Sequence, residues 1–442
     1  MSRVLRILAS LVVLVSVLAG SARPFHASTA AAAAKKVLVM TLANPYVDPA
    51  IYLNDKTKKT DPADYSNAQL TKRIFAMFYK MHPDYVIKPV NWGWSDALRQ
   101  KILLNVAAGT GPDVITGEDF FPEFARDGIL VPVELGPLQK EIAPATLSVG
   151  MYDGKTYAVP AESGIFELFY NKTLFKQAGL DPNKPPATWD QWLADSKKIA
   201  ALGHGISGTA TEVNTGLGAS FRLAPFMRQV GGDFTSKDGM KITFNSPGNL
   251  KAFTFLRQLT ATQVPGLSSA TDEGKWFAAG WWANKAGFVV DGPWEIASSQ
   301  QFKLNFGVAP LPVAPGGHPA NVVVGNQMFA VMKASKNQQA ALDLVRIFGT
   351  EAASRLNYKY TGRLPINLNV LNNDVMKAGG PISVFAEGLK VPGITGLPAY
   401  PANPANIWDI FYNLQVAALA TNQPIANLLA TAQSNAEAQL AQ

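Results

Sequence analysis

The chain of 442 residues contains no cysteine. Disulfide bridges, thiolate metal sites and a cysteine nucleophile are therefore excluded. Histidine is also scarce, and the four histidines stand alone, with no pair at the spacing of a zinc site. We therefore expect neither a metal nor a cofactor.

Charged residues are sparse as well. They make up 16% of the chain, against roughly 25% in an average soluble domain. The net charge is +7, but Lys and Arg gather only in short pairs such as Lys58-Lys59. A surface for nucleic acid or anionic lipid is therefore not expected. Apolar residues reach 48%, which is enough to build large cores in two or three domains.

Long apolar runs are missing except near the start of the chain. Residues 7–19, ILASLVVLVSVLA, follow the basic residues Arg3 and Arg6. A run of about 13 apolar residues is short for a membrane span but typical of a signal peptide. We predict a signal segment over residues 1–34 with cleavage between 22 and 34, and therefore export. A retained N-terminal anchor is the alternative.

Familiar catalytic motifs are absent too. There is no G-x-S-x-G sequence around a nucleophilic serine. Residues 150–156, GMYDGKT, resemble a phosphate-binding loop, but three residues separate the two glycines where that loop needs four. We predict instead a hairpin turn at Asp153-Gly154. Nothing in these patterns favours an enzyme.

The residues that are present alternate between strand and helix patterns. Short apolar runs at 37–42, 85–91 and 114–115 predict buried strands. Helical stripes begin at Ser66 and Ser95 between them. This alternation is typical of an α/β domain with a parallel sheet.

The same pattern continues through the second half of the chain. Thr188 and Gln191 fit a capping box, and Ser246-Pro247 predicts another helix start. Further strands are predicted at 286–290, 305–309 and 327–332.

Four segments together carry a family resemblance. They are residues 157–192 (YAVPAESGIFELFYNKTLFKQAGLDPNKPPATWDQW), 107–120 (AAGTGPDVITGEDF), 291–294 (DGPW) and 325–337 (GNQMFAVMKASKN). In order and spacing they resemble the extracellular solute-binding proteins of ABC importers, family 1, whose branch includes maltose-, sugar- and glycerol-phosphate-binding proteins. The resemblance implies the two-lobed type II periplasmic-binding-protein fold, an α/β fold with a hinge and a central cleft. It also implies a protein that binds a ligand and performs no chemistry on it.

In that fold the chain crosses between the lobes more than once. The resemblance places the crossings near Pro160, Gly325-Asn326 and Arg363-Leu364. Lobe one would then comprise residues 36–160 and 326–363, and lobe two residues 161–325 and 364–442.

The resemblance also points to ligand contacts. Trp294 and Trp408 match aromatic residues that stack on the ligand in this family, and a flat ring suits the apolar face of a sugar. Polar residues that follow strands are candidates because ligands gather at the carboxyl ends of strands in open α/β sheets. The predicted ligand-binding residues are Trp294, Trp408, Glu118, Asp119, Glu162, Asn326, Asn44, Asp48, Trp282 and Arg363.

We therefore predict a monomeric binding protein that captures a sugar or oligosaccharide by hinge closure and delivers it to a membrane permease. Without cysteine it would not be tethered by the thioether-linked lipid that many family members carry. Two other ligands remain open: glycerol 3-phosphate, for which Arg222 and Arg363 are candidate partners, and a polyamine. An extracellular glycosidase, with a carboxylate pair drawn from Glu118, Asp119, Glu162 and Glu167, is the alternative from another class. Residues 43–65 are predicted to form a long loop.

Overall fold

A computed structural model of the chain describes residues 34–237, 239–268, 274–398 and 404–441. The predicted signal segment lies outside the described residues except for its last position. Within the described ranges, no helix is both long enough and apolar enough to cross a membrane.

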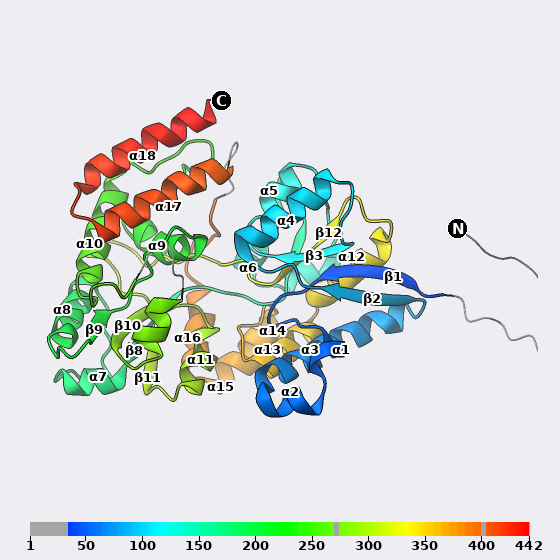
Figure 1. Cartoon of the computed structure of the whole chain (residues 1–442), viewed down its shortest axis with the longest axis horizontal. Coiled ribbons are helices and arrows are strands. Elements are labelled where there is room, and N and C mark those ends of the chain that lie inside the picture. The colour runs from blue at the N-terminus through cyan, green and yellow to red at the C-terminus, as the bar shows by residue number, and fades with distance from the viewer. Residues whose placement is uncertain (1–33, 238, 269–273, 399–403, 442) are drawn as a thin grey trace, which may run out of the picture. The chain divides into compact units, whose positions relative to one another are not determined.

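The first sheet has six strands, of which Figure 1 labels β1, β2, β3 and β12. Strand β1 pairs in parallel with β2 and β3, as predicted, but β12 runs antiparallel to β3 and joins β4 and β7 on its other side. The sheet is therefore mixed rather than purely parallel. Its strands are β1 (Lys36–Thr41), β2 (Tyr85–Val90), β3 (Val114–Gly117), β4 (Leu130–Val131), β7 (Ala158–Pro160) and β12 (Met328–Met332).

The second sheet has four strands in the order β11-β8-β10-β9. They are β8 (Glu167–Asn171), β9 (Ser207–Thr209), β10 (Ala286–Asp291) and β11 (Phe306–Ala309). Successive side chains of β8 enter different cores: Leu168 and Tyr170 join one hydrophobic cluster, whereas Phe169 joins another. This alternation is the period of two that a strand imposes, so helices can bury both faces of the sheet.

Helices flank both sheets. Those that precede β7 or directly follow β12 are α1 (Pro49–Tyr52), α2 (Asp55–Thr60), α3 (Pro62–Met81), α4 (Ser95–Ala107), α5 (Phe121–Arg126), the 3₁₀ helix η1 (Gly136–Lys140), α6 (Pro144–Ser148), α12 (Gln338–Phe348) and α13 (Glu351–Thr361). Those between β8 and β12 are α7 (Lys172–Gln177), α8 (Trp189–Ala200), α9 (Leu217–Gln229), α10 (Pro247–Thr260), the π-helix η2 (Trp276–Trp281) and α11 (Glu295–Gln301). The last are α14 (Leu368–Val370), the π-helix η3 (Leu371–Val375), α15 (Met376–Ala378), α16 (Pro381–Gly388), α17 (Pro404–Ala420) and α18 (Ile425–Leu440).

Local signals in the sequence form as predicted. Thr188 and Gln191 make the capping box of α8, and Ser246 caps α10. Asp153-Gly154 is the turn of a hairpin between β5 (Met151–Tyr152) and β6 (Lys155–Thr156), and both residues have positive φ. The long loop predicted at residues 43–65 is wrong, because most of this segment forms α1, α2 and the start of α3. Asp48, Asn54 and Asp61 accept hydrogen bonds at the three helix starts.

Three segments connect the two sheets, and they lie side by side. The N–H of Ala161 donates to the carbonyl of Gln327 at 3.0 Å, and the N–H of Ser163 donates to that of Leu364 at 2.8 Å. A third bond runs from the N–H of Val324 to the carbonyl of Gly164, also at 2.8 Å. Residues 160 or more positions apart thus form one narrow bridge between the sheets.

Candidate functional site

An ion pair lies at this bridge. Nη1 of Arg363 donates to Oε1 of Glu162 at 2.7 Å, and Nη2 of Arg363 donates to Oδ1 of Asn44 at 3.2 Å. The Glu162 side chain is 1% exposed and that of Arg363 21% exposed. The amide of Gln327 also donates to the carbonyl of Asn44. Three of the predicted site residues are therefore in direct contact.

Glu162 is buried, and only Oε1 of its two carboxyl oxygens has a hydrogen-bond partner. Burial raises the pKa of Glu162, while the charge of Arg363 opposes that rise. Nearby, Nδ2 of Asn357 donates to the hydroxyl of Tyr46 at 2.7 Å and to the carbonyl of Ala161 at 3.2 Å. The buried amide of Asn357 therefore holds the chain at Ala161, the residue before Glu162.

Trp294 and Asn326 both lie beside Gly164. A Cβ atom placed on Gly164 would lie 3.0 Å from the Trp294 ring and 3.4 Å from Nδ2 of Asn326. Trp294 is half-buried, at the start of α11 just after β10, and its ring meets that of Phe166 edge-on at 5.9 Å. Gly164 is two residues from Glu162, so the aromatic ring lies next to the polar cluster along the same segment.

Asp119 lies against the bridging segment that contains Asn326. Its carboxylate accepts the N–H of Gly325 at 3.1 Å, next to Asn326. Burial raises the pKa of Asp119 to about 7, and the bond from Gly325 opposes the rise. Glu118, beside it at the end of β3, is buried. The structure thus places Asn44, Glu162, Arg363, Trp294, Asn326 and Asp119 along the bridging segments.

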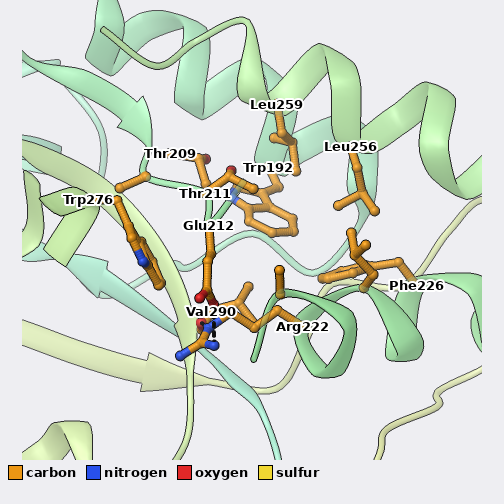
Figure 2. A pocket seen from close by; sticks show the side chains of 13 residues that line it. Trp192, Thr209, Thr211, Glu212, Arg222, Phe226, Leu256, Leu259, Trp276 and Val290 are labelled. Carbon is orange, nitrogen blue, oxygen red and sulfur yellow. Dashed lines mark hydrogen bonds and ion pairs between the residues drawn. The ribbon is translucent and has the colours of Figure 1, made fainter. Parts of the chain in front are cut away.

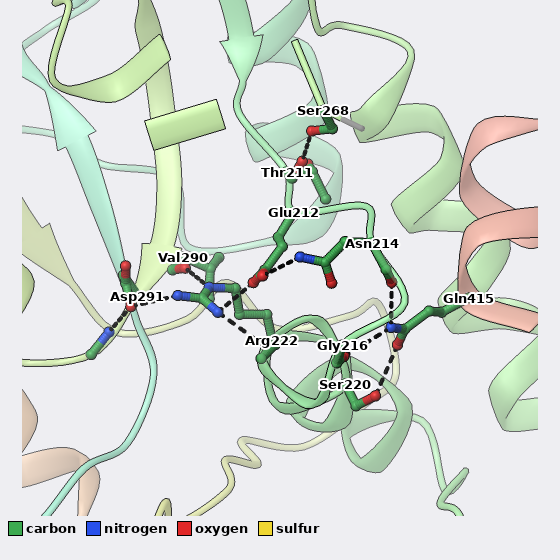
Figure 3. Close-up of polar contacts among 12 residues, drawn as sticks. Thr211, Glu212, Asn214, Gly216, Ser220, Arg222, Ser268, Val290, Asp291 and Gln415 are labelled. Atoms are coloured by element: carbon green, nitrogen blue, oxygen red, sulfur yellow. Dashed lines mark hydrogen bonds and ion pairs between the residues drawn. The ribbon is translucent and has the colours of Figure 1, made fainter. Parts of the chain in front are cut away.

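A second charged cluster lies at the carboxyl ends of β9 and β10. Figure 3 shows Arg222 between Glu212 and Asp291, with Nη1 2.5 Å from Glu212 and Nη2 2.9 Å from Asp291. The same guanidinium donates to the carbonyls of Val290 and Gly218. Burial raises the pKa of Asp291, and the Arg222 charge opposes that rise. One arginine therefore pairs with two buried carboxylates.

Aromatic rings enclose this cluster. The Arg222 guanidinium lies 5.2 Å from the centre of the Phe166 ring and 5.0 Å from that of Trp276. Figure 2 shows the Trp276 ring beside Arg222 and Glu212, at one end of a cavity that continues between Trp192 and Leu256. With a volume of about 20 Å³, the cavity has room for about one water molecule. Phe166 contacts both Arg222 and Trp294, so it connects this cluster to the bridge.

The remaining predicted residues have structural partners of their own. Trp408 lies half-buried on α17, and its ring contacts Phe234 at 5.5 Å. Trp282 stacks on Phe302 at 5.0 Å and donates to Glu295 at 3.0 Å. Asp48 caps α1 through the N–H of Ala50.

Sequence reasoning missed Glu212, Asp291 and Phe166. Glu212 follows a strand of only three residues, and Asp291 is the last residue of β10. The rule that ligands gather at strand ends could have drawn attention to both carboxylates. Their shared partner Arg222 lies on α9, and no spacing in the sequence connects it to them. Among the described residues, no group of three or more acidic or histidine side chains could hold a metal.

Comparisons with known proteins agree on one family. The model of the bacterial extracellular solute-binding protein matches residues 59–354, about two thirds of the chain. A binding protein of Brucella abortus (strain 2308) is 28% identical over 351 residues, which cover 75% of this chain and 81% of the relative. A maltooligosaccharide ABC transporter solute-binding lipoprotein of Streptococcus pneumoniae (strain R6) is 23% identical over 329 residues, 72% of this chain and 74% of the relative.

The fold matches a solved structure. The cyclic alpha-maltosyl-1,6-maltose binding protein of Arthrobacter globiformis superposes with a TM-score of 0.74 over 92% of this chain and 99% of that protein, at 22% identity. The prediction of a two-lobed periplasmic-binding-protein fold is therefore confirmed.

Proposed function

Since the chain belongs to the bacterial extracellular solute-binding protein family, we propose that it is the ligand-capturing component of an ABC importer and that its ligand is a sugar or oligosaccharide. The names of its relatives support this proposal, because one binds maltooligosaccharides for an ABC transporter and another binds a cyclic maltose-based sugar. Ligand binding without chemistry is the activity that we propose.

The observation that carries the sugar proposal is the arrangement around Gly164. A half-buried tryptophan ring and the Asn326 amide lie next to the position that a side chain at residue 164 would occupy. A sugar presents an apolar C–H face to an aromatic ring and a rim of hydroxyls to polar groups. Trp294 would stack on the ligand, and Asn326 would bond to its hydroxyls.

The other predicted residues remain part of the proposed ligand set. Glu162, Arg363 and Asn44 would bind hydroxyls next to Trp294. Asp119 and Glu118 would bind hydroxyls near Asn326. Trp408 would supply a second ring. Asp48 and Trp282 already bind or stack within the protein, so we assign them a weaker contribution.

Capture would occur by hinge closure about the three bridging segments. We propose that residues 36–160 and 326–363 form one lobe and residues 161–325 and 364–442 the other. The ligand can favour closure only to the extent that it binds the closed form more tightly than the open form. Two charged groups that already lie at the bridge, Glu162 and Arg363, could contribute such state-dependent contacts.

The rival ligands receive less support. A phosphate needs arginine N–H groups in the site, but those of Arg222 already serve two carboxylates and two carbonyls. A polyamine needs free carboxylates, whereas Glu162, Glu212 and Asp291 are each paired with arginine. The same pairing argues against Glu162 as a glycosidase acid.

Membership of the family supports a proposal for location and partners. We propose that the chain is exported, that it acts outside the cytoplasm as a monomer, and that a membrane permease recognises its closed form. We also propose that it is not tethered through a cysteine-linked lipid, because the sequence contains no cysteine.

A thermal-shift screen tests the proposal. The purified protein is heated with a panel of mono- and oligosaccharides, glycerol 3-phosphate and spermidine. A rise in Tm with a saccharide that is recovered intact is the expected result, since a ligand that binds only the folded state stabilises it. A rise with glycerol 3-phosphate alone, or a rise with spermidine alone that persists in Glu167→Gln, would overturn the sugar assignment. Cleavage of the saccharide during incubation would overturn the assignment as a binding protein.

A further inference from the structure

A second pocket lies between α16 and the segment that follows β11. It has a volume of about 330 Å³ and will be called the α16 pocket. This volume falls at the lower end of small-molecule sites, which span roughly 300–1,000 Å³. Its walls are largely apolar and include Pro310, Leu311, Pro319, Val384 and Val391.

One buried carboxyl group lines the α16 pocket. Glu167, the first residue of β8, is 2% exposed and lines the pocket. Its Oε2 accepts the N–H of Leu311 at 2.9 Å. Its Oε1 lies against Gly388 of α16, where a Cβ atom would stand only 2.2 Å away. Any side chain at position 388 would displace the carboxyl, so the glycine makes room for it.

The charges around Glu167 do not neutralise it. On α16, Glu387 at the rim pairs with Lys390 at 2.8 Å, and both side chains are more than half exposed. On β10, Asp291 stands opposite Glu167 in register but pairs with Arg222. The pocket lining from the segment after β11 contains no charged residue. Burial raises the pKa of Glu167 well above its usual range, and the Leu311 N–H opposes that rise.

We propose that the α16 pocket binds a small organic cation, whose ammonium group pairs with Oε1 of Glu167 and whose hydrocarbon body fills the apolar space. A buried carboxyl in an apolar pocket is stabilised in its charged form by an opposite charge more than by any neutral partner. This site is separate from the proposed sugar site and does not depend on the sugar assignment.

Benzylamine is the probe, and benzyl alcohol is its neutral counterpart of similar size. Isothermal titration calorimetry at pH 7.5, without sugar, should show benzylamine binding at least roughly tenfold more tightly than benzyl alcohol. The cation pairs with the ionised carboxylate, so titrations in two buffers of different ionisation enthalpy should detect any proton that the carboxyl releases on binding.

Three variants make the test specific. Glu167→Gln should abolish both the preference for benzylamine and the proton release, while Glu387→Gln at the exposed rim should leave both nearly unchanged. Val384→Phe should fill the pocket and weaken both probes together. Equal affinity for the amine and the alcohol in the unmodified protein would overturn the proposal, as would the absence of measurable benzylamine binding. Full retention of the preference in a folded Glu167→Gln protein would also overturn it.

Discussion

Nη1 of Arg363 lies 2.7 Å from Oε1 of Glu162, although 201 positions separate the two residues in the chain. Glu162 belongs to the first of the three bridging segments and Arg363 to the last. The pair therefore fastens the ends of the bridge to each other, and Asn44 joins it from the end of β1. Charged groups in this position can contribute to the hinge and to the ligand site at once.

The two partners of this pair should respond differently to mutation. Arg363→Ala leaves Glu162 buried without its countercharge, and we expect a loss of about 3 kcal/mol in the free energy of unfolding. Glu162→Gln keeps a hydrogen-bond acceptor for the more exposed arginine and should cost only about 1 kcal/mol. Urea denaturation at pH 7 measures both. A larger loss in Glu162→Gln than in Arg363→Ala would contradict this account.

The two tryptophans of the α11 region should differ in ligand binding. Trp294→Ala removes a ring that lies beside Gly164 and Asn326, and the affinity for the best saccharide should fall by about tenfold to hundredfold. Trp282→Phe should have a smaller effect, because Trp282 already stacks on Phe302 and bonds to Glu295. Calorimetry on folded variants checks the order. Unchanged affinity in Trp294→Ala would remove Trp294 from the proposed site.

Much of the fold could be predicted because its signals are local. The caps at Thr188 and Ser246 and the turn at Asp153-Gly154 depend on residues within a few positions of each other. β12 is antiparallel to its neighbours because of the path that the chain takes over more than 150 residues before it returns to the first sheet. No local pattern encodes that path. The segment at 43–65 was mistaken for a loop because α1 and α2 are short and bury no residue completely.

The residues of the candidate site also fall into those that local sequence signals predict and those that they do not. Trp294 and Glu162 were recognisable because they stand in segments that resemble family motifs. Their neighbours were not: Phe166 looks like any apolar strand residue, and Glu212 meets Arg222 only because the fold brings α9 beside the segment that follows β9. Contacts of this kind arise from tertiary packing, so the sequence predicts candidates but not their pairing.

Arg222 should be among the most sensitive charged residues of the protein. Arg222→Met leaves Glu212 and Asp291 buried without their countercharge, and we expect a loss of about 3–5 kcal/mol in the free energy of unfolding. The matched control is Arg355→Met, since Arg355 also pairs with two carboxylates but is 44% exposed, and it should change stability little.

A second substitution tests whether the loss comes from the unpaired charge. Asp291→Asn should cost less stability in the Arg222→Met background than in the unmodified protein, because the carboxylate is harmful only when its arginine is missing. Strictly additive losses from the two substitutions would contradict a role for Arg222 in neutralising Asp291.

Glu295 predicts a specific dependence of stability on pH. Burial raises its pKa from 4.5 to about 8, the charge of Asp291 adds to the rise, and the bond from Ser299 opposes it. Between these values the unfolded chain loses the proton while the folded protein keeps it, so the unfolded state binds fewer protons and stability falls as the pH rises. The contribution is complete below about pH 4.5 and is lost by about pH 8.

Glu295→Gln should therefore flatten the decline in the free energy of unfolding across this window, whereas Glu437→Gln on the exposed face of α18 should leave it unchanged. Urea denaturation at four pH values between 4.5 and 8.5 measures the slope, and equal slopes for the unmodified protein and Glu295→Gln would show that Glu295 is already ionised in the folded state.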